Sequence, residues 1–496
     1  MAAVINTNIA SLNAQRNLNS SQGALQTSLQ RLSSGLRINS ARDDAAGMAI
    51  SQRMTAQIRG LDQARRNAND GVSMAQTAEG ALSGVGDMLQ RIRELAVQSA
   101  NATNSTSDRA ALQAEAGQLV SELDRVATAT QFNGLNLLDG TSGPSVFQVG
   151  ANANQTITTN GENFRTTSYG GYRIGASVAV NSNGLGDLTV GSTIGAVDSS
   201  ATAASRIAGG AFTVNGGAGS QTITYAAADS AKTVAAAVNA KTSATGVTAS
   251  AFTEVDLTAI ATSDSVSLSI LSDNATATTV AFSTGAVANA DGLAAGIKAF
   301  NNVSSSTGVT AKLNTLGTGI TLTNANGNDI SLTNNSVTAT LSVGTAAPQA
   351  LAVAGGVGVA TGKLTLDSDK AFGVSAAVVG DWFLAASEGA QLQKVSQIDV
   401  SSVAGATRAI AQMDAAIANV NSSRSDFGAL QNRFSNAINS LMTTSENLSA
   451  ARSRIMDTDF AAETSSLTRA QILQQAGTAM LAQANQVPNQ VLTLLQ

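Results

Sequence analysis

The chain has 496 residues, a net charge of −5, and neither histidine nor cysteine. It therefore lacks the residues for a Ser–His–Asp triad, a thiol nucleophile, a disulfide or a zinc site of His and Cys. Its aromatic content of 3% supplies little lining for a large ligand pocket. We expect no enzyme, no cofactor and no metal site, although a site built from carboxylates alone is left open. The slightly acidic charge predicts no nucleic-acid partner.

Hydropathy predicts no contact with a membrane, because no run of 18 or more apolar residues occurs in the chain. The first residues, MAAVINTNIASLNAQR, lack the basic segment and the unbroken apolar core of a secretory signal peptide. An extracellular protein with this beginning would need a dedicated export route.

Both ends of the chain carry apolar residues seven positions apart, which is typical of helices that pack along one stripe. Alone, each end would bury its stripe poorly, whereas each Leu buried against a neighbour contributes about 1.5–3 kcal/mol. We therefore expect these ends to fold on assembly. The stripe residues are Leu18, Leu25 and Leu32 at the first end, and Leu473, Met480, Val487 and Leu494 at the second.

The segment SARDDAAGM, residues 40–48, reads as an irregular joint between two helices. Arg42, Asp43, Asp44 and Met48 are its candidate joint or assembly residues. The adjacent Asp residues suggest a metal or acid–base site at first sight, but neighbouring side chains point apart and nothing nearby completes such a site.

A long helix follows, with two interleaved seven-residue series that predict a left-handed coiled coil. Its many glycines weaken an isolated helix by up to about 1 kcal/mol each, so the helix needs partners. A second helix is predicted over 105–129, with Ser107 as its N-cap. The first series is Leu61, Ala68, Ala75, Leu82, Leu89 and Ala96, and the second is Ala64, Gly71, Ala78, Val85 and Ile92.

The middle of the chain is rich in Thr, Val, Gly and Asn, which suits strands and turns. Residues 224–252 and 281–314 form an internal repeat, and in each copy we expect a strand, a short helix and a Thr-Gly-Val turn into another strand. Residues 320–332 predict a hairpin turned at Asn326-Gly327. The middle is thus predicted to hold one or two small α+β modules.

The last part of the chain predicts another coiled-coil helix, over 403–455, that would be roughly 80 Å long at 1.5 Å per residue. A companion series is expected at Val403, Ile410, Ile417 and Ile438, with Arg424 among the residues that interrupt it. The main apolar series recurs at Ala406, Met413, Val420, Phe427, Phe434, Leu441, Leu448 and Ile455.

Several long motifs give the chain a resemblance to a known family. They are SSGLRINSARDDAAGMAIS at 33–51, LQRIRELAVQSAN at 89–101, TQFNGLNLLDG at 130–140 and ENLSAARSRIMDTDFAAETSSLTRAQILQQAGTAMLAQANQ at 446–486. Both terminal arms closely resemble bacterial flagellin, the filament subunit of the flagellum.

The resemblance implies a multidomain fold of α plus α+β class. Long coiled-coil helices from both termini would pair, with a β-rich variable outer region inserted between them. The implied domains are an inner coiled coil (1–44 and 454–496), a helical-bundle core (45–175 and 400–453) with a hairpin near 146–157, and an outer region (176–399). The outer region would hold two repeat modules, at about 209–262 and 265–335.

The resemblance also implies a function and partners. The chain would leave the cell unfolded through the flagellar type III apparatus, without a cleaved signal peptide, and polymerise into an extracellular helical filament for motility. Its other partners would be an export chaperone, the filament cap, hook-associated proteins and a host Toll-like receptor. Residue by residue, Arg91, Leu95, Gln98 and Glu115 match the family's receptor and protofilament contacts, and we expect the first three on one helix face.

Three other interpretations compete with this one. A hook–filament junction protein shares the terminal arms, although the full match in both arms favours flagellin. A metallopeptidase insert of the H-E-x-x-H type is excluded by the absence of histidine. The Thr- and Ser-rich outer region also permits O-glycosylation or surface binding, which composition alone does not decide.

Overall fold

The computed structural model describes residues 7–174, 207–344, 349–351, 353, 355–376, 378, 382–383 and 386–493, apart from the side chains of 349 and 487–493. The chain forms two compact units. Unit 1 draws on Met1–Gln76, Pro144–Asn160 and Phe427–Gln496, and unit 2 on Thr77–Gly143 and Gly161–Asp426. The domain boundaries expected from the family stay predictions.

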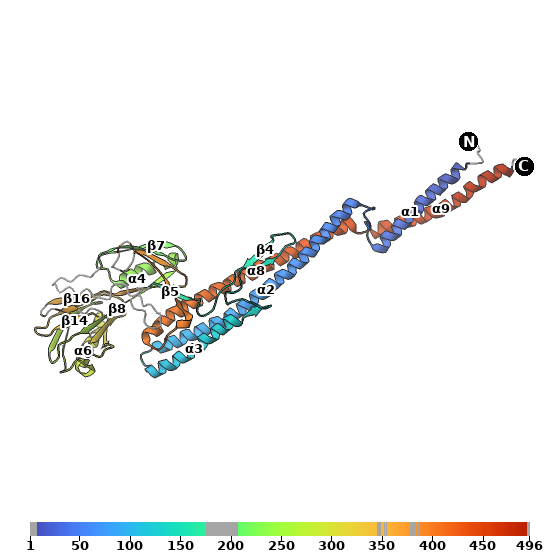
Figure 1. The fold of residues 1–496 in the computed structure, drawn as a ribbon. Coiled ribbons are helices and arrows are strands. Elements are labelled where there is room, and N and C mark those ends of the chain that lie inside the picture. Colours follow the sequence, from blue (N-terminus) through green and yellow to red (C-terminus); the bar gives the residue numbers. More distant parts are fainter. Residues whose placement is uncertain are drawn as a thin grey trace. The chain divides into compact units, whose positions relative to one another are not determined.

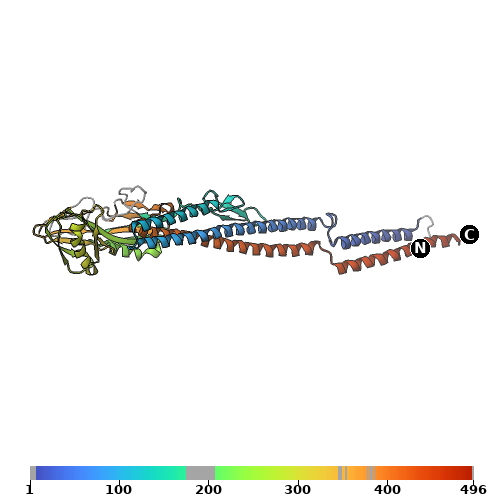
Figure 2. The same ribbon diagram turned by 90° about the horizontal axis from the view of Figure 1, so that it is seen from below.

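In unit 1 the two ends of the chain pair as helices. Helix α1 (Ile9–Ser34) and helix α9 (Phe460–Thr493) lie side by side, and the start of α1 and the end of α9 are at the same end of the pair (Figures 1 and 2). Asn8 caps α1 by accepting a hydrogen bond from the Ser11 amide, and its side chain donates to the Ala484 carbonyl at 2.8 Å. Gly35, at φ +70°, ends α1 in the left-handed conformation typical of a C-cap.

The seam of this pair is made mostly of small and polar residues. Ser11, Ser28 and Ala470 are buried in it, whereas Leu18 and Leu25 are only half-buried. The most deeply buried positions of the seam are therefore small or polar, and its leucines are covered only in part.

The predicted coiled-coil helices are confirmed as α2 (Ala45–Ala100) and α8 (Val403–Met456). Within unit 1, Leu61 and Ala64 of α2 share a buried cluster with Leu441 of α8, and Gly71 faces the ring of Phe434. Both predicted series of α2 are buried throughout. On α8 the main series is buried from Ala406 to Leu441.

The companion series expected on α8 is wrong. Val403 is 46% exposed, and Ile410, Ile417 and Ile438 are only partly buried. The buried companions instead follow the main series by three residues. Most of these companion positions hold small side chains, and the larger Ile residues therefore suggested the wrong side of the helix. The buried companion residues are Ala409, Ala416, Ser423 and Leu430.

Helix α3 (Thr106–Ala129) confirms the short helix predicted after α2, but its N-cap is Ser105 rather than Ser107. The Ser105 hydroxyl accepts from the Asp108 amide, and the Asp108 carboxylate accepts from the Ser105 amide at 2.9 Å. Reciprocal bonds of this kind need an acidic or amide residue three positions after the cap, which Ser105 has and Ser107 lacks.

Two hairpins accompany the helices. In unit 2, β1 (Gln131–Phe132) pairs with β2 (Leu135–Asn136) across a two-residue turn. In unit 1, β3 (Ser145–Gln148) pairs with β4 (Thr156–Thr159), so a hairpin does lie near 146–157. It is attached to the helices by Asn67, which donates to the Gln148 carbonyl at 3.0 Å, and by an edge-to-face contact of Phe147 with Phe434.

Three larger antiparallel sheets occupy the rest of unit 2 in the described residues. The largest follows the order β11-β12-β8-β17-β5-β20, with β14 paired to β8 and β15 paired to β14; the second follows β10-β9-β13-β16, and the third β19-β18-β6-β7. In chain order the bounds are β5 Gly170–Ile174, β6 Gly210–Asn215, β7 Ser220–Tyr225, β8 Val247–Thr258, β9 Ser265–Leu271, β10 Thr278–Ser283, β11 Val309–Leu313, β12 Ile320–Asn324, β13 Ile330–Asn334, β14 Leu341–Val343, β15 Gln349–Leu351, β16 Gly356–Ala360, β17 Lys363–Ser368, β18 Gly373–Ala376, β19 Ser387–Gly389 and β20 Gln391–Lys394.

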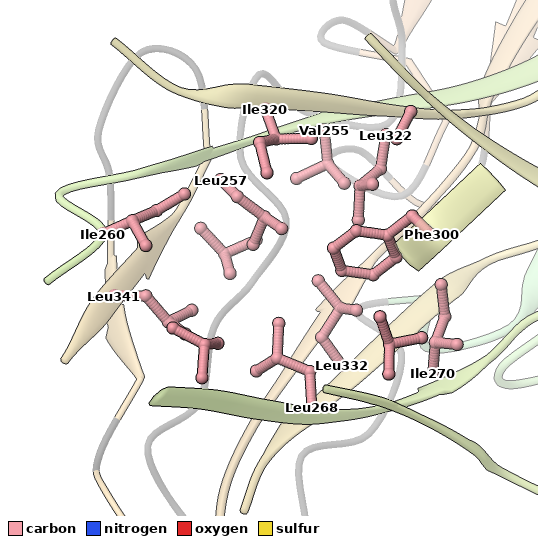
Figure 3. Close-up of a cluster of buried hydrophobic side chains, with 14 of the residues drawn as sticks. Val255, Leu257, Ile260, Leu268, Ile270, Phe300, Ile320, Leu322, Leu332 and Leu341 are labelled. Atoms are coloured by element: carbon pink, nitrogen blue, oxygen red, sulfur yellow. The ribbon is translucent and has the colours of Figure 1, made fainter. Parts of the chain in front are cut away.

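An apolar core lies between two of these sheets. Figure 3 shows the side chains of β8 and β12 facing those of β9 and β13, with Phe300 entering from helix α6 (Ala290–Asn302). Alternate residues of the strands point into this core, as the period of two requires. A second core surrounds Trp382, the only tryptophan of the chain, and Phe212.

The internal repeat is confirmed as a structural repeat. The first copy contains β7, α4 (Ala231–Asn239), α5 (Thr242–Thr245) and β8; the second contains β10, α6, α7 (Ser304–Thr307) and β11. In each copy an asparagine side chain binds both the amide and the carbonyl of a strand residue ten positions later. Asn239 binds Ala249 at 2.8 and 2.8 Å, and Asn301 binds Ala311 at 2.8 and 3.0 Å.

The hairpin predicted over 320–332 is wrong. Strand β12 pairs with β8 and β11, whereas β13 pairs with β9 and β16, so the chain changes sheets at Asn326-Gly327. The Asp273 carboxylate holds this corner, since it accepts hydrogen bonds from the side-chain amides of Asn324, Asn326 and Asn328, each at 2.7 Å. An Asn-Gly turn fixes the chain reversal but leaves open which strands then pair.

Residues 35–44 form the loop that connects α1 to α2, and a short 3-10 helix, Val395–Gln397, follows β20.

No helix in the described part of the chain combines the length and the apolar character needed to span a membrane.

Candidate functional site

The joint at residues 40–48 is held by its two aspartates acting separately. Asp44 caps α2, accepting from the Gly47 amide at 2.8 Å, and Asp43 accepts from the amides of Ser40 and Asn39 at 2.8 and 3.2 Å. The hydrogen bonds from Ser40 hold the pKa of the Asp43 carboxyl below its usual range. Arg42 is exposed and Met48 is half-buried. The aspartates therefore shape the backbone of the joint rather than combining into one site.

A second contact fixes the joint to the end of α8. The Arg37 amide donates to the Met456 carbonyl at 2.6 Å, and the Arg37 side chain donates to the Ile455 carbonyl at 2.7 Å. Leu36 and Asp457 form an isolated antiparallel bridge. The segment between α1 and α2 is thus hydrogen-bonded to the end of α8 and to the residue that follows it.

The stripes predicted at the two ends lie on different faces of the α1–α9 pair. Leu18, Leu25 and Leu32 are half-buried in the described chain. Leu18 lies against Gly477 of α9, because a Cβ on Gly477 would be 3.4 Å from the Leu18 Cδ1 atom. In contrast, Leu473 is 51% exposed and Met480 is 64% exposed. The side chain of Val487 and all of Leu494 are outside the described residues.

The outward face of α9 carries another apolar side chain, Ile472, which is 60% exposed. Phe460 at the start of α9 and Leu29 on α1 are also exposed. Single exposed apolar residues are normal on protein surfaces, but a row that repeats along one helix indicates an interaction surface.

The residues matched to the receptor contacts gather where α2 and α3 run side by side in unit 2. The Arg91 guanidinium donates to the Glu115 carboxylate at 2.8 and 3.2 Å and to Glu94 at 3.0 Å. The hydrogen bond with Glu115, followed by that with Glu94, raises the pKa of Arg91. Gln98 is exposed about two turns further along α2 than Arg91. Arg91, Glu115 and Gln98 thus form an exposed polar surface.

The expectation that Leu95 lies on this exposed face is wrong for the described fold, since Leu95 has 0% exposure. Helix α3 covers a second side of α2, as shown by Arg109, whose guanidinium donates to the Ser99 and Asn101 carbonyls at 2.9 Å each. Ser99 is buried as well. Because both α8 and α3 cover α2, more of its surface is buried than the heptad seam alone. The heptad pattern of α2 does not predict this second contact.

Two ion pairs between α2 and α8 were missed by the sequence analysis. Arg93 donates to Asp414 at 2.5 Å, and Arg424 donates to Glu79 at 3.2 Å, both within unit 2. The hydrogen bond with Asp414 raises the pKa of Arg93. The position of Arg424 in the heptad series could have indicated its ion pair, because a charged residue beside a coiled-coil seam often pairs with an opposite charge on the facing helix.

No group of three or more Asp and Glu side chains in the described residues is arranged to hold a metal ion. Among the described residues, the candidate residues expected from the sequence lie on helix seams, at caps and on exposed faces.

Comparison with known proteins places both arms and part of the middle. The bacterial flagellin N-terminal helical region matches residues 5–143, the bacterial flagellin C-terminal helical region matches 410–495, and the flagellin hook IN motif matches 211–263. The chain is 42% identical to the B-type flagellin of Pseudomonas aeruginosa and 39% identical to a flagellin of Salmonella typhimurium, with each pair of chains covered completely.

The chain belongs to the bacterial flagellin family. This is a family of structural proteins that form the flagellar filament. Among solved structures, FliC from Burkholderia pseudomallei matches 73% of this chain and 99% of its own at 22% identity, with a TM-score of 0.31. The flagellin hook IN motif covers the first copy of the internal repeat, and the Asn301 contact extends the same device to the second copy.

Proposed function

We propose that this flagellin polymerises with copies of itself into an extracellular filament used for motility. The observation that carries the proposal is the exposed apolar row of α9, formed by Ile472, Leu473 and Met480. These side chains are 51–64% exposed although they lie on a helix that is already paired with α1. Covering them in an assembly would contribute about 1.5–3 kcal/mol for each side chain fully buried.

The composition of the α1–α9 seam explains why the apolar surface is directed outward. Its most deeply buried positions are small or polar residues and its leucines stay half-buried, so the pair leaves part of its apolar area uncovered. Assembly would then supply much of the stability of the terminal helices, which is the usual consequence of binding only to the folded state.

A double substitution tests this proposal. Leu473→Ser with Met480→Ser removes two apolar side chains from the exposed row and leaves the seam with α1 intact. We expect the purified variant to stay monomeric in sedimentation after seeding with filament fragments. The matched control is Leu316→Ser, which removes an 80% exposed leucine from the turn between β11 and β12 and should polymerise normally. Normal filaments from the double variant would refute the assembly role of this row.

For export we propose the flagellar type III route, and partners that include an export chaperone, the filament cap and hook-associated proteins. The family membership supports this proposal. The absence of cysteine is consistent with it, because no disulfide would hinder passage of an unfolded chain. Secretion of the chain should stop in a strain whose flagellar export apparatus is inactivated.

We also propose that a host Toll-like receptor recognises the monomer through the surface of Arg91, Gln98 and Glu115. The contact of Arg91 with Glu115 fixes two of these side chains across α2 and α3. Since Leu95 is buried, we assign it the role of supporting that surface from beneath rather than that of a direct contact.

A receptor reporter assay on folded monomers tests this surface. Arg91→Ala should lower activation strongly, whereas Arg125→Ala, which breaks another exposed pair on α3 with Glu122, should leave it unchanged. Equal potency of the two variants would contradict the proposed recognition surface.

We propose no enzymatic activity, because the described residues form a scaffold of seams and caps and the chain has neither the imidazole nor the thiol that many acid–base and nucleophilic mechanisms use. The junction-protein alternative is not favoured, since the relatives matched over their whole length at 42% and 39% identity are flagellins.

A further inference from the structure

Asparagine followed by glycine occurs at Asn133, Asn160, Asn215 and Asn326 among the described residues, in very different surroundings. Glycine offers no Cβ to shield its backbone nitrogen, so these dipeptides are the most prone to attack on the preceding amide. The folded structure should decide which of them reacts.

We propose that Asn133 is a site of spontaneous deamidation in the folded chain. The backbone nitrogen of Gly134 attacks Cγ of Asn133 and loses its proton, the bond from Cγ to the side-chain nitrogen breaks, and ammonia leaves. The five-membered succinimide then adds water at either carbonyl, which yields aspartate or isoaspartate. Solvent water is the only co-reactant.

The turn at Asn133 is open on every side that the reaction needs. Asn133 and Gly134 are both exposed, and a Cβ on Gly134 would have no atom within 4 Å. They are the two residues of the β1–β2 turn, at φ +50° and +80°. The flanking strands have two residues each, so the turn can open at little cost, because such short hairpins are marginally stable.

The other dipeptides are restrained. The Asn326 side chain donates to Asp273 at 2.7 Å in the corner between two sheets. Asn215 accepts from the Ser220 hydroxyl at 2.6 Å, and the Gly216 amide, the required nucleophile, donates to the Gly219 carbonyl at 2.9 Å. After Asn160, the backbone of Gly161 packs directly on the Ser142 carbonyl.

The products would alter the turn in two ways. Both place a negative charge on an exposed loop that is neutral now. Isoaspartate also adds a methylene to the backbone, and the two-residue turn then no longer fits the pairing of Phe132 with Leu135. The modification would therefore loosen the hairpin.

Timed incubation of the purified full-length chain at mildly alkaline pH, followed by peptide mapping, tests the proposal. Tandem mass spectra are needed because Asn133 and Asn160 share the tryptic peptide 126–165. We expect Asn133 to deamidate about tenfold faster than Asn215 or Asn326, a difference equivalent to about 1.4 kcal/mol in barrier. An isoaspartyl methyltransferase assay should label the same peptide.

Incubation in denaturing urea is the control that separates fold from sequence. There the four asparagines should react at similar rates, because their restraints are gone. Comparable rates in the folded chain, faster reaction at Asn160, or the same ranking in urea would each overturn the proposal.

Discussion

Leu18 of α1 lies against Gly477 of α9, where a Cβ would be 3.4 Å from the leucine Cδ1. This contact shows how the ends of the chain pair: a leucine from one helix meets a glycine on the other, and the helices approach closely. Ile472, Leu473 and Met480 of α9 remain on its outer side. The contact at Gly477 and the exposure of Leu473 and Met480 are two consequences of one sequence pattern.

The first prediction concerns two glycines of α2 with opposite surroundings. A Cβ at Gly71 would lie 2.5 Å from the Phe434 ring, whereas one at Gly80 would have no atom within 4 Å. Gly71→Ala should lower the free energy of unfolding by about 1–3 kcal/mol through overpacking. Gly80→Ala should raise it by up to about 1 kcal/mol through helix propensity. Urea unfolding followed by circular dichroism measures both, and a stabilised Gly71→Ala chain would contradict the packing described.

The second prediction compares a buried and an exposed residue of the receptor motif. Leu95→Ala should lower the free energy of unfolding by about 2–5 kcal/mol because it leaves a cavity under α3. Arg91→Ala removes only exposed ion pairs, so its effect should stay within about 1 kcal/mol. Unfolding in urea distinguishes them, and a Leu95→Ala chain as stable as the parent would mean that α3 does not cover this part of α2.

The third prediction concerns the asparagine contacts of the repeat. Replacing Asn301 by Ala removes two hydrogen bonds to the Ala311 backbone and should cost about 1–3 kcal/mol, and Asn239→Ala should have a similar effect in the first copy. Asn302→Ala is the matched control, since Asn302 is an equally exposed asparagine at the end of α6 and the hydrogen bonds to Ala311 come from Asn301. Thermal unfolding of each variant gives the comparison, and equal melting of Asn301→Ala and Asn302→Ala would remove the proposed structural role.

The fourth prediction concerns acid sensitivity of the corner at Asp273. Burial raises the pKa of the Asp273 carboxyl. The hydrogen bonds from the side-chain amides of Asn324, Asn328 and Asn326 together lower this pKa by more than burial raises it, so the net shift is downward. A lowered pKa means stability that is present above the unfolded pKa, about 3.9, and lost as the pH falls through the folded value. The melting temperature of Asp273→Asn should therefore be below that of the parent near neutral pH, and the gap should narrow in acid. A gap that stays constant with pH would exclude this linkage.

The sequence was sufficient for features that depend on spacing along one element. The α2 seam from Leu61 to Ala96, the bounds of α8 and the two repeat copies all follow from periodicity or from alignment of the copies with each other. These patterns persist because a helix or strand repeats its side-chain directions at a fixed interval.

Features that depend on a third element could not be predicted in this way. Leu95 is buried because α3 covers a second side of α2, and the position of α3 is not encoded in the α2 heptads. The Asn326-Gly327 turn leads from one sheet to another because Asp273, far away in sequence, binds three asparagines there. The side of α8 that Ala409 and Ala416 occupy was missed because small residues make a weak hydrophobic signal beside Ile410 and Ile417.

A cryo-electron microscopy map of filaments grown from the purified chain tests the central claim most directly. We predict that α1 and α9 pair through Leu18 and Gly477, and that Leu473 and Met480 are covered by a neighbouring subunit. A filament in which these two side chains remain open to solvent would contradict the account, as would a map in which the terminal helices of one chain do not pair.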